Sequence, residues 1–107
     1  MAHEHANPGA VMDLLTFGET MSTALVKERE FESILLRLEP GRSIPEHKVD
    51  GPITVQCVSG ACAFTVDGEP REMVAGSWLY LRGGALHALQ ADEPCTLLVT
   101  IMFPHHT

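Results

Sequence analysis

From Ser22 onward, short strand-like runs separated by turn residues follow one another along the chain, and this pattern constrains the fold more than any other feature. The runs cover residues 22–29, 31–38, 53–58, 62–66, 72–81, 85–90 and 95–103. Turn signals lie between them, among them an Asp-Gly pair at Asp67 and Gly68 that is typical of tight hairpins. About eight or nine short strands, with little room for helices, predict an all-β sandwich or barrel.

The length of the chain, 107 residues of which 45% are hydrophobic, suits one domain with one core. Residues 1–10 are polar and contain Pro8 and Gly9, so we expect a flexible N-terminal arm followed by a single domain over residues 11–107. A chain of this size buries only about 65% of its unfolded surface. A second copy that covers an apolar face would add stability, and we therefore expect a homodimer.

The charge balance narrows the class of partner. Seven Lys and Arg against fourteen Asp and Glu give a net charge of −7, which disfavours nucleic-acid phosphates and anionic membranes. No apolar run approaches the roughly 20 residues that span a bilayer, and the first residues lack the features of a signal peptide. We expect a cytoplasmic protein whose partner is a small molecule, not a nucleic acid or a membrane.

Three cysteines, Cys57, Cys62 and Cys95, stand in apolar surroundings. Their number is odd and no CxxC spacing is present, so the sequence predicts neither a disulfide framework nor a thiolate zinc site. Buried free thiols are the expected state.

The spacing of glycines and histidines in two segments distinguishes among the all-β folds. Gly41, His47 and Gly60 stand in one segment, and Gly76, Gly84 and His87 stand in the next. This spacing resembles the two motifs of the cupin family, the first over residues 41–60 and the second over residues 76–91. The resemblance implies a double-stranded β-helix, or jelly-roll barrel.

Several positions depart from the family pattern. Val49 stands where the first cupin motif has its second histidine, and Ile53 stands where it has a glutamate. In the second motif Arg82 replaces a proline and Ala91 replaces an asparagine. The resemblance is therefore strong for the fold and weak for the activity, since one scaffold hosts dioxygenases, isomerases, epimerases, storage proteins and sensor modules.

Alternation along a strand indicates which side chains face the interior. If the chain ran as one strand without a bulge, the odd positions from His47 to Cys57 would share an inward face. The resemblance implies that His87, on another strand, lies near His47. The predicted ligand-binding residues are therefore His47, His87, Val49, Ile53, Val55 and Cys57.

Two histidines make an incomplete metal site. Catalytic zinc has three protein ligands, and facial-type iron needs two histidines and a carboxylate. His47 and His87 would hold Zn, Ni, Fe or Cu only weakly unless Cys57, another side chain or a bound ligand completed the site. No cofactor is certain, and a divalent transition metal at low occupancy stays an alternative.

Three classes of function follow. The leading prediction is a small-molecule-binding cupin, sensory or accessory, with an apolar pocket and two histidines. The second is a metal-dependent dioxygenase or isomerase, so whether the protein is an enzyme stays open. The third is a structural module whose barrel is filled by Phe64, Trp78 and Met102. Trp78 and Tyr80 share one strand face and suit either a planar ligand or a dimer interface.

Overall fold

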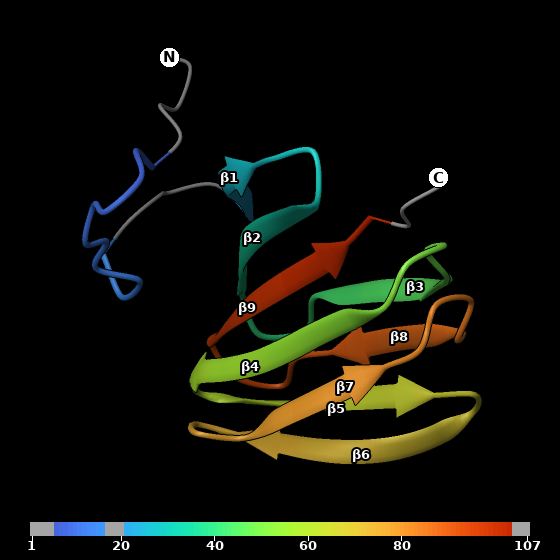
Figure 1. Ribbon diagram of the computed structural model, residues 1–107. Helices are drawn as coiled ribbons and strands as arrows, with labels where there is room; N and C mark the ends of the chain where they lie inside the picture. Colours follow the sequence, from blue (N-terminus) through green and yellow to red (C-terminus); the bar gives the residue numbers. More distant parts are fainter. Residues whose placement is uncertain (1–5, 17–20, 104–107) are drawn as a thin grey trace.

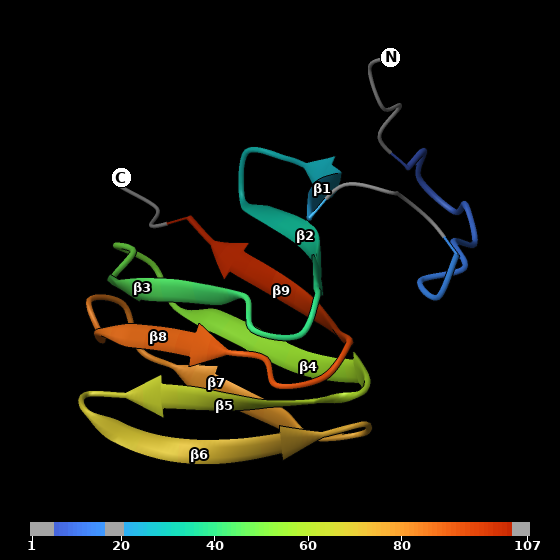
Figure 2. The ribbon, with the colours of Figure 1, turned by 180° about the vertical axis from the view of Figure 1, so that it is seen from behind.

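The structure, a computed structural model, describes residues 6–16 and 21–103. In these residues nine strands form two antiparallel sheets that pack face to face (Figure 1, Figure 2). The five-stranded sheet has the order β1 (Ser22–Lys27), β2 (Phe31–Leu38), β9 (Cys95–Met102), β4 (Ile53–Ser59) and β7 (Trp78–Leu81). The four-stranded sheet has the order β3 (Ser43–His47), β8 (His87–Gln90), β5 (Ala61–Val66) and β6 (Glu69–Val74). The all-β prediction is confirmed.

The tight turn between β5 and β6 follows from its Asp-Gly pair. Val66 pairs with Glu69, so only Asp67 and Gly68 connect the two strands. Both have positive φ, 48° and 82°, as a two-residue turn of the primed type requires. The predicted hairpin is confirmed.

The run from His47 to Cys57 is not one strand, so the condition under which its odd positions would share one face is not met. β3 ends at His47, residues 48–52 form a bend, and β4 begins at Ile53 in the opposite sheet. Pro52, which has no N–H for a ladder bond, lies directly before β4. His47 and Ile53 therefore face each other from two sheets instead of sharing one strand.

The core lies between the two sheets. Along β4 the exposed fractions of Ile53, Val55 and Cys57 are 3%, 0% and 0%, as alternation predicts. Phe64 and Met73 are also buried in the core. The buried cluster consists of Leu38, Ile53, Val55, Cys57, Cys62, Phe64, Met73, Leu81, Leu89, Ala91, Cys95 and Leu97.

Residues 6–16 contain no strand or helix and lie against the edge of the five-stranded sheet. The Ala6 N–H donates to the Leu25 carbonyl oxygen at 2.7 Å, and Arg37 Nη2 donates to the Leu14 carbonyl oxygen at 3.1 Å. Residues 1–5 of the expected arm lie outside the described residues, so its flexibility stays a prediction. Nowhere in the described ranges is there a helix long and apolar enough to cross a membrane.

Candidate ligand-binding site

A cavity of about 170 Å³ lies between the two sheets. It occupies the end of the barrel where β3 ends and β8 begins, on the right in Figure 1. Apart from two histidines, every residue that lines it is apolar. These residues are Ile34, Leu36, Ile44, His47, Val49, Ile53, Val55, Phe64, His87, Leu89, Val99 and Ile101.

A bulge in β3 brings His47 to the cavity. Ile44 pairs with Leu89 and His47 pairs with His87, so β3 uses one residue more than β8 over this stretch. Ile44 and His47 are three positions apart and would point to opposite faces of a regular strand. Because of the extra residue at Pro45 or Glu46, Ile44 and His47 point to the same face, and both line the cavity.

The two histidine rings are in contact. Their centroids lie 4.2 Å apart with an angle of 59° between the ring planes. The His87 ring also stacks on Phe64, with the centroids 5.9 Å apart and the planes 8° from parallel. The His87 ring thus contacts two aromatic neighbours.

Backbone hydrogen bonds set the tautomer of both rings. His47 Nδ1 lies 3.0 Å from the Pro45 carbonyl oxygen, and His87 Nδ1 lies 3.0 Å from the Ala85 carbonyl oxygen. A carbonyl oxygen only accepts, so each Nδ1 carries the hydrogen and donates it. In a neutral ring Nε2 then carries a lone pair, and each histidine offers the cavity contents a hydrogen-bond acceptor.

Burial favours the neutral form of His87. Only 5% of its surface is exposed, whereas His47 is exposed at the mouth of the cavity. Burial lowers the pKa of His87, the bond to Ala85 opposes this, and the neighbouring His47 lowers it further. At neutral pH His87 is therefore an uncharged acceptor inside an apolar pocket.

Five of the six predicted site residues line this cavity: His47, Val49, Ile53, Val55 and His87. The sixth, Cys57, does not. It lies on β4 four residues beyond Ile53, roughly 13 Å along the strand. Its Sγ donates to the Ser59 and Gly60 carbonyl oxygens at 3.5 Å, and burial raises its pKa to about 11. The expectation that Cys57 completes a site with the two histidines is wrong.

Sequence reasoning missed seven residues of the lining. They are Ile34, Leu36, Ile44, Phe64, Leu89, Val99 and Ile101. Four of them could have been predicted from alternation along β2 and β9, because residues 34 and 36 and residues 99 and 101 are apolar and each two share a strand face. Leu36 pairs with Leu97 and Ile34 with Val99, and this register places the side chains of both strands on the same wall of the cavity.

A metal-binding group with three protein ligands is absent from the described residues, since no three His, Cys, Asp or Glu side chains are placed to hold an ion. Val49 and Ile53, at the two departures from the cupin motif, contribute apolar wall instead. The donor set at the cavity consists of two imidazole Nε2 atoms.

Trp78, Tyr80 and Met102 do not fill the barrel. Their exposed fractions are 63%, 53% and 37%, and none of them lines the cavity. Met102 as a core residue was therefore a wrong expectation. Trp78 and Tyr80 share a face of β7, as predicted, and this face is the outer one.

Comparison with known proteins identifies the fold. The family model of the cupin domain matches residues 34–101, well over half of the chain. A conserved protein of unknown function from Streptococcus pyogenes has 24% sequence identity and a TM-score of 0.81, with 99% of this chain and 100% of that chain covered. A cupin superfamily protein from Desulfitobacterium hafniense has 16% identity and a TM-score of 0.84, with 97% and 100% covered.

A third solved structure is the cupin domain of an XRE family transcriptional regulator from Enterobacter cloacae. It has 23% identity and a TM-score of 0.70, with 78% of this chain and 96% of that chain covered. A search of the curated proteins finds no match. At these identities the solved structures establish the fold and leave the ligand open.

Proposed function

The chain belongs to the cupin domain family, and we propose that it binds a small, mostly apolar molecule with one hydroxyl or N–H group. The observation that carries the proposal is an apolar cavity with two imidazole acceptors. A cavity of this kind matches the general form of small-molecule sites, in which apolar walls surround a few fixed polar groups. Family membership alone assigns no ligand.

The size of the cavity limits the ligand. A protein cavity of about 150 Å³ lined by Leu, Ile and Phe accepts benzene. The volume here, about 170 Å³, therefore suits one six-membered ring or a branched aliphatic group of similar size. Larger molecules would have to extend past His47 into solvent.

The polar groups limit the chemistry of the ligand. Each Nδ1 donates to the backbone, so the Nε2 atoms accept and do not donate while the rings are neutral. A ligand that brings only acceptors, such as a ketone or an ether, would leave His87 Nε2 without a partner in a buried place. A phenol, an alcohol or an N–H donor would satisfy it.

The second candidate is a metal-dependent cupin enzyme. Two imidazoles that line one cavity, each ring held through Nδ1, are a favourable half of a metal site. The other half does not fit, because Val49 and Ile53 stand at the remaining ligand positions and Cys57 lies elsewhere. We therefore derive no reaction from a metal.

Metal content separates these candidates. The measurement is plasma mass spectrometry on untagged protein prepared without chelator, compared with a variant that carries His47→Phe and His87→Phe. We expect far less than one metal per chain in both proteins. Near-stoichiometric metal that is lost in the variant would favour the enzyme.

A filled structural barrel is the least supported class. It required Trp78 and Met102 inside, and both side chains are exposed. The cavity also occupies the volume that such a barrel would fill.

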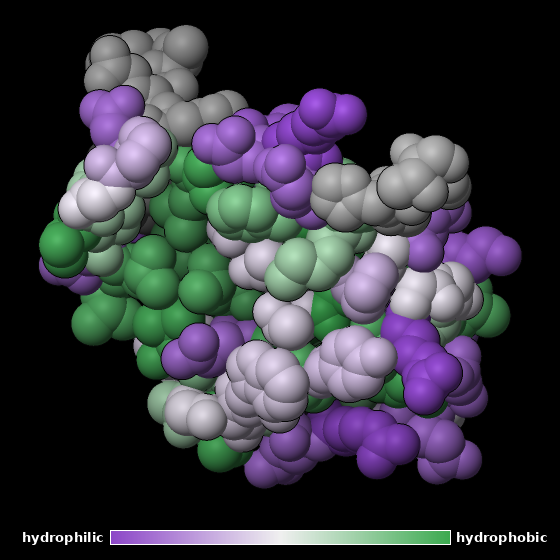
Figure 3. Space-filling model, in the orientation of Figure 1, coloured by the Kyte–Doolittle hydropathy of each residue, from purple (hydrophilic) through white to green (hydrophobic). Residues whose placement is uncertain are grey.

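A homodimer remains part of the proposal. β7 is an edge strand whose two aromatic side chains are more than half exposed. Further apolar surface gathers beside residues 6–16, on the left in Figure 3, where Val11 and Leu15 are 97% and 58% exposed. A second copy across the outer face of the five-stranded sheet would cover both areas. A cytoplasmic location is proposed too, and the free thiols support it.

Binding of two near-isosteric probes tests the proposed function. Phenol and toluene differ by a hydroxyl in place of a methyl group, and calorimetric titration gives the affinity of each. The proteins are the wild type, the variant with both His47→Phe and His87→Phe, and Tyr80→Phe as a control outside the cavity. We expect the double substitution to weaken phenol relative to toluene by about tenfold, because the buried hydroxyl loses its acceptor.

The control should behave as the wild type. Equal changes for phenol and toluene in the histidine variant would refute a hydrogen-bonding role. The absence of binding of either probe to the wild type would refute the proposed ligand class.

A further inference from the structure

Three cysteines lie together at the end of the barrel opposite the histidine pair. Cys57 is near the end of β4, Cys62 near the start of β5 and Cys95 at the start of β9, on the left in Figure 1. All three are free, and their exposed fractions are 0%, 5% and 2%. The cavity and its ligand use none of them.

Cys62, on the four-stranded sheet, and Cys95, on the five-stranded sheet, belong to one buried cluster between the sheets. The backbone is close at the same place, because a Cβ on Gly60 would lie 2.9 Å from Cys95 Cα. The turn from β4 to β5 therefore packs directly on the start of β9. A covalent bond between the two sulfur atoms would join the sheets where they already touch.

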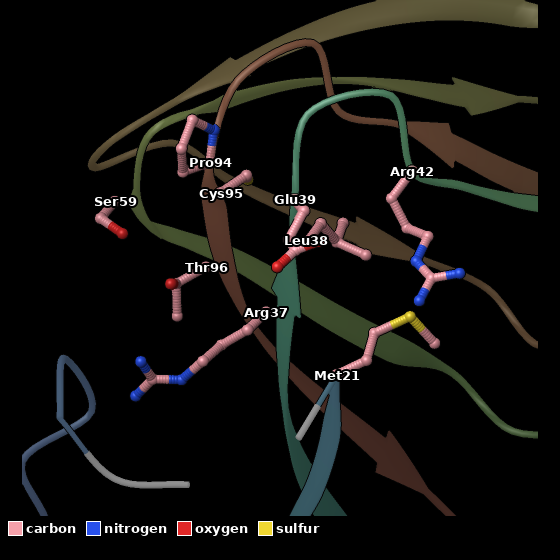
Figure 4. A pocket seen from close by; sticks show the side chains of 9 residues that line it. All are labelled: Met21, Arg37, Leu38, Glu39, Arg42, Ser59, Pro94, Cys95 and Thr96. Atoms are coloured by element: carbon pink, nitrogen blue, oxygen red, sulfur yellow. The ribbon is translucent and has the colours of Figure 1, made fainter. Parts of the chain in front are cut away.

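Two surface hollows lead to these two thiols. Cys95 borders a hollow of about 400 Å³ with Arg37 and Arg42 at opposite ends (Figure 4). Cys62 borders another, of about 220 Å³, whose other residues are Ala61, Glu72, Asp92 and Glu93. Cys57 borders neither hollow. A small reagent therefore approaches Cys62 and Cys95 from the surface, while Cys57 is enclosed.

The pKa values of the three thiols also differ. The neighbouring Cys95 lowers the pKa of Cys62, although burial opposes it. The neighbouring Cys62 and burial raise the pKa of Cys95, and burial raises the pKa of Cys57 to about 11. Since the thiolate is the nucleophile, Cys62 is the most reactive of the three.

We propose that Cys62 and Cys95 are a modification site, where a hydroperoxide produces a reversible intramolecular disulfide. The Cys62 thiolate attacks the terminal oxygen of the peroxide, the O–O bond breaks, and hydroxide or alkoxide leaves with the electron pair. The sulfenic acid then reacts with the Cys95 thiol. The S–S bond forms as the S–O bond breaks, and one water leaves with the Cys95 proton. Two thiols are oxidised and one peroxide is reduced.

Peptide mapping of the wild type tests this site without any substitution. Folded protein is treated with hydrogen peroxide, then unfolded and alkylated, and the joined peptides are identified by mass spectrometry. We expect a loss of two of the three titratable thiols. The joined residues should be Cys62 and Cys95, Cys57 should be alkylated, and dithiothreitol should restore all thiols.

Two variants sharpen the test. Cys57→Ala should leave the disulfide in place, and Cys62→Ala should abolish it; thermal unfolding checks that both proteins fold. A disulfide that contains Cys57, a bond between two chains, or three intact thiols under conditions that oxidise the unfolded chain would each overturn the proposal.

Discussion

Gly60→Ala tests the close packing at the thiol end of the barrel. Gly60 has φ of +77°, and a Cβ added there would overlap the Pro94 carbonyl oxygen and lie 2.9 Å from Cys95 Cα. Gly41 is a matched control, because its φ is +85° and an added Cβ meets nothing within 4 Å. Both glycines stand at the ends of the first cupin motif, so the pair separates backbone conformation from contact.

The expected loss in the free energy of unfolding differs between the two positions. An alanine with positive φ costs about 1 kcal/mol at either site. At Gly60 the overlap is with backbone, which cannot rotate away as a side chain would, and overpacking adds about 2–3 kcal/mol. We therefore expect a loss in the free energy of unfolding of about 1 kcal/mol for Gly41→Ala and about 3–4 kcal/mol for Gly60→Ala.

Urea unfolding followed by far-ultraviolet circular dichroism measures both losses, with equal slopes required for a valid comparison. Equal losses in the two variants would show that the turn from β4 to β5 moves away from β9 at little cost. That result would refute the tight contact, and with it the fixed approach of Cys62 to Cys95.

Two further predictions concern pH and assembly. The pKa of His87 in the folded protein lies below its ordinary value of 6.5, so as pH falls through that value the unfolded chain takes up a proton that the folded chain does not. Stability should therefore fall below pH 6.5, by at most about 1.4 kcal/mol per pH unit, and urea unfolding should show a smaller fall for His87→Phe. Replacing both Trp78 and Tyr80 by serine should convert a dimer into a monomer in sedimentation velocity, whereas a wild-type monomer at the same concentration would contradict the proposed interface.

Much of the fold was predictable because its strands alternate regularly. β2 runs over the predicted residues 31–38, and the Asp67-Gly68 turn joins β5 and β6 as expected. The spacing of the glycines and histidines then selected the barrel type. His47 and His87 come together because their strands pair, and the motif spacing implied this proximity.

The rest depends on features that alternation does not contain. The bulge near Pro45 changes which residues of β3 face inward, so Ile44 joins the cavity lining. The bend at residues 48–52 transfers the chain to the other sheet. Cys57 faces inward, as alternation predicted. Alternation gives the face of a strand but not the position along it, and Cys57 lies with the other two thiols, away from the cavity.

Alternation also does not decide which face of β7 is buried. Trp78 and Tyr80 alternate with Leu79 and Leu81, and either pair fits a buried face by hydrophobicity. Pairing with β4 decides the matter, since Leu79 lies opposite Val55 and Leu81 opposite Ile53, both of them inward. The aromatic residues are then outside.

The tautomers of His47 and His87 are the most direct test of the account, because the proposed ligand class follows from two Nε2 acceptors at the cavity. Nitrogen-15 NMR of histidine-labelled protein near neutral pH distinguishes an unprotonated ring nitrogen from a protonated one, and the two Phe variants assign the signals. We predict an unprotonated Nε2 in His87, with its signal shifting when phenol is added. A hydrogen on Nε2 of His87 would make that ring a donor to the cavity, and would contradict the proposed choice of ligand.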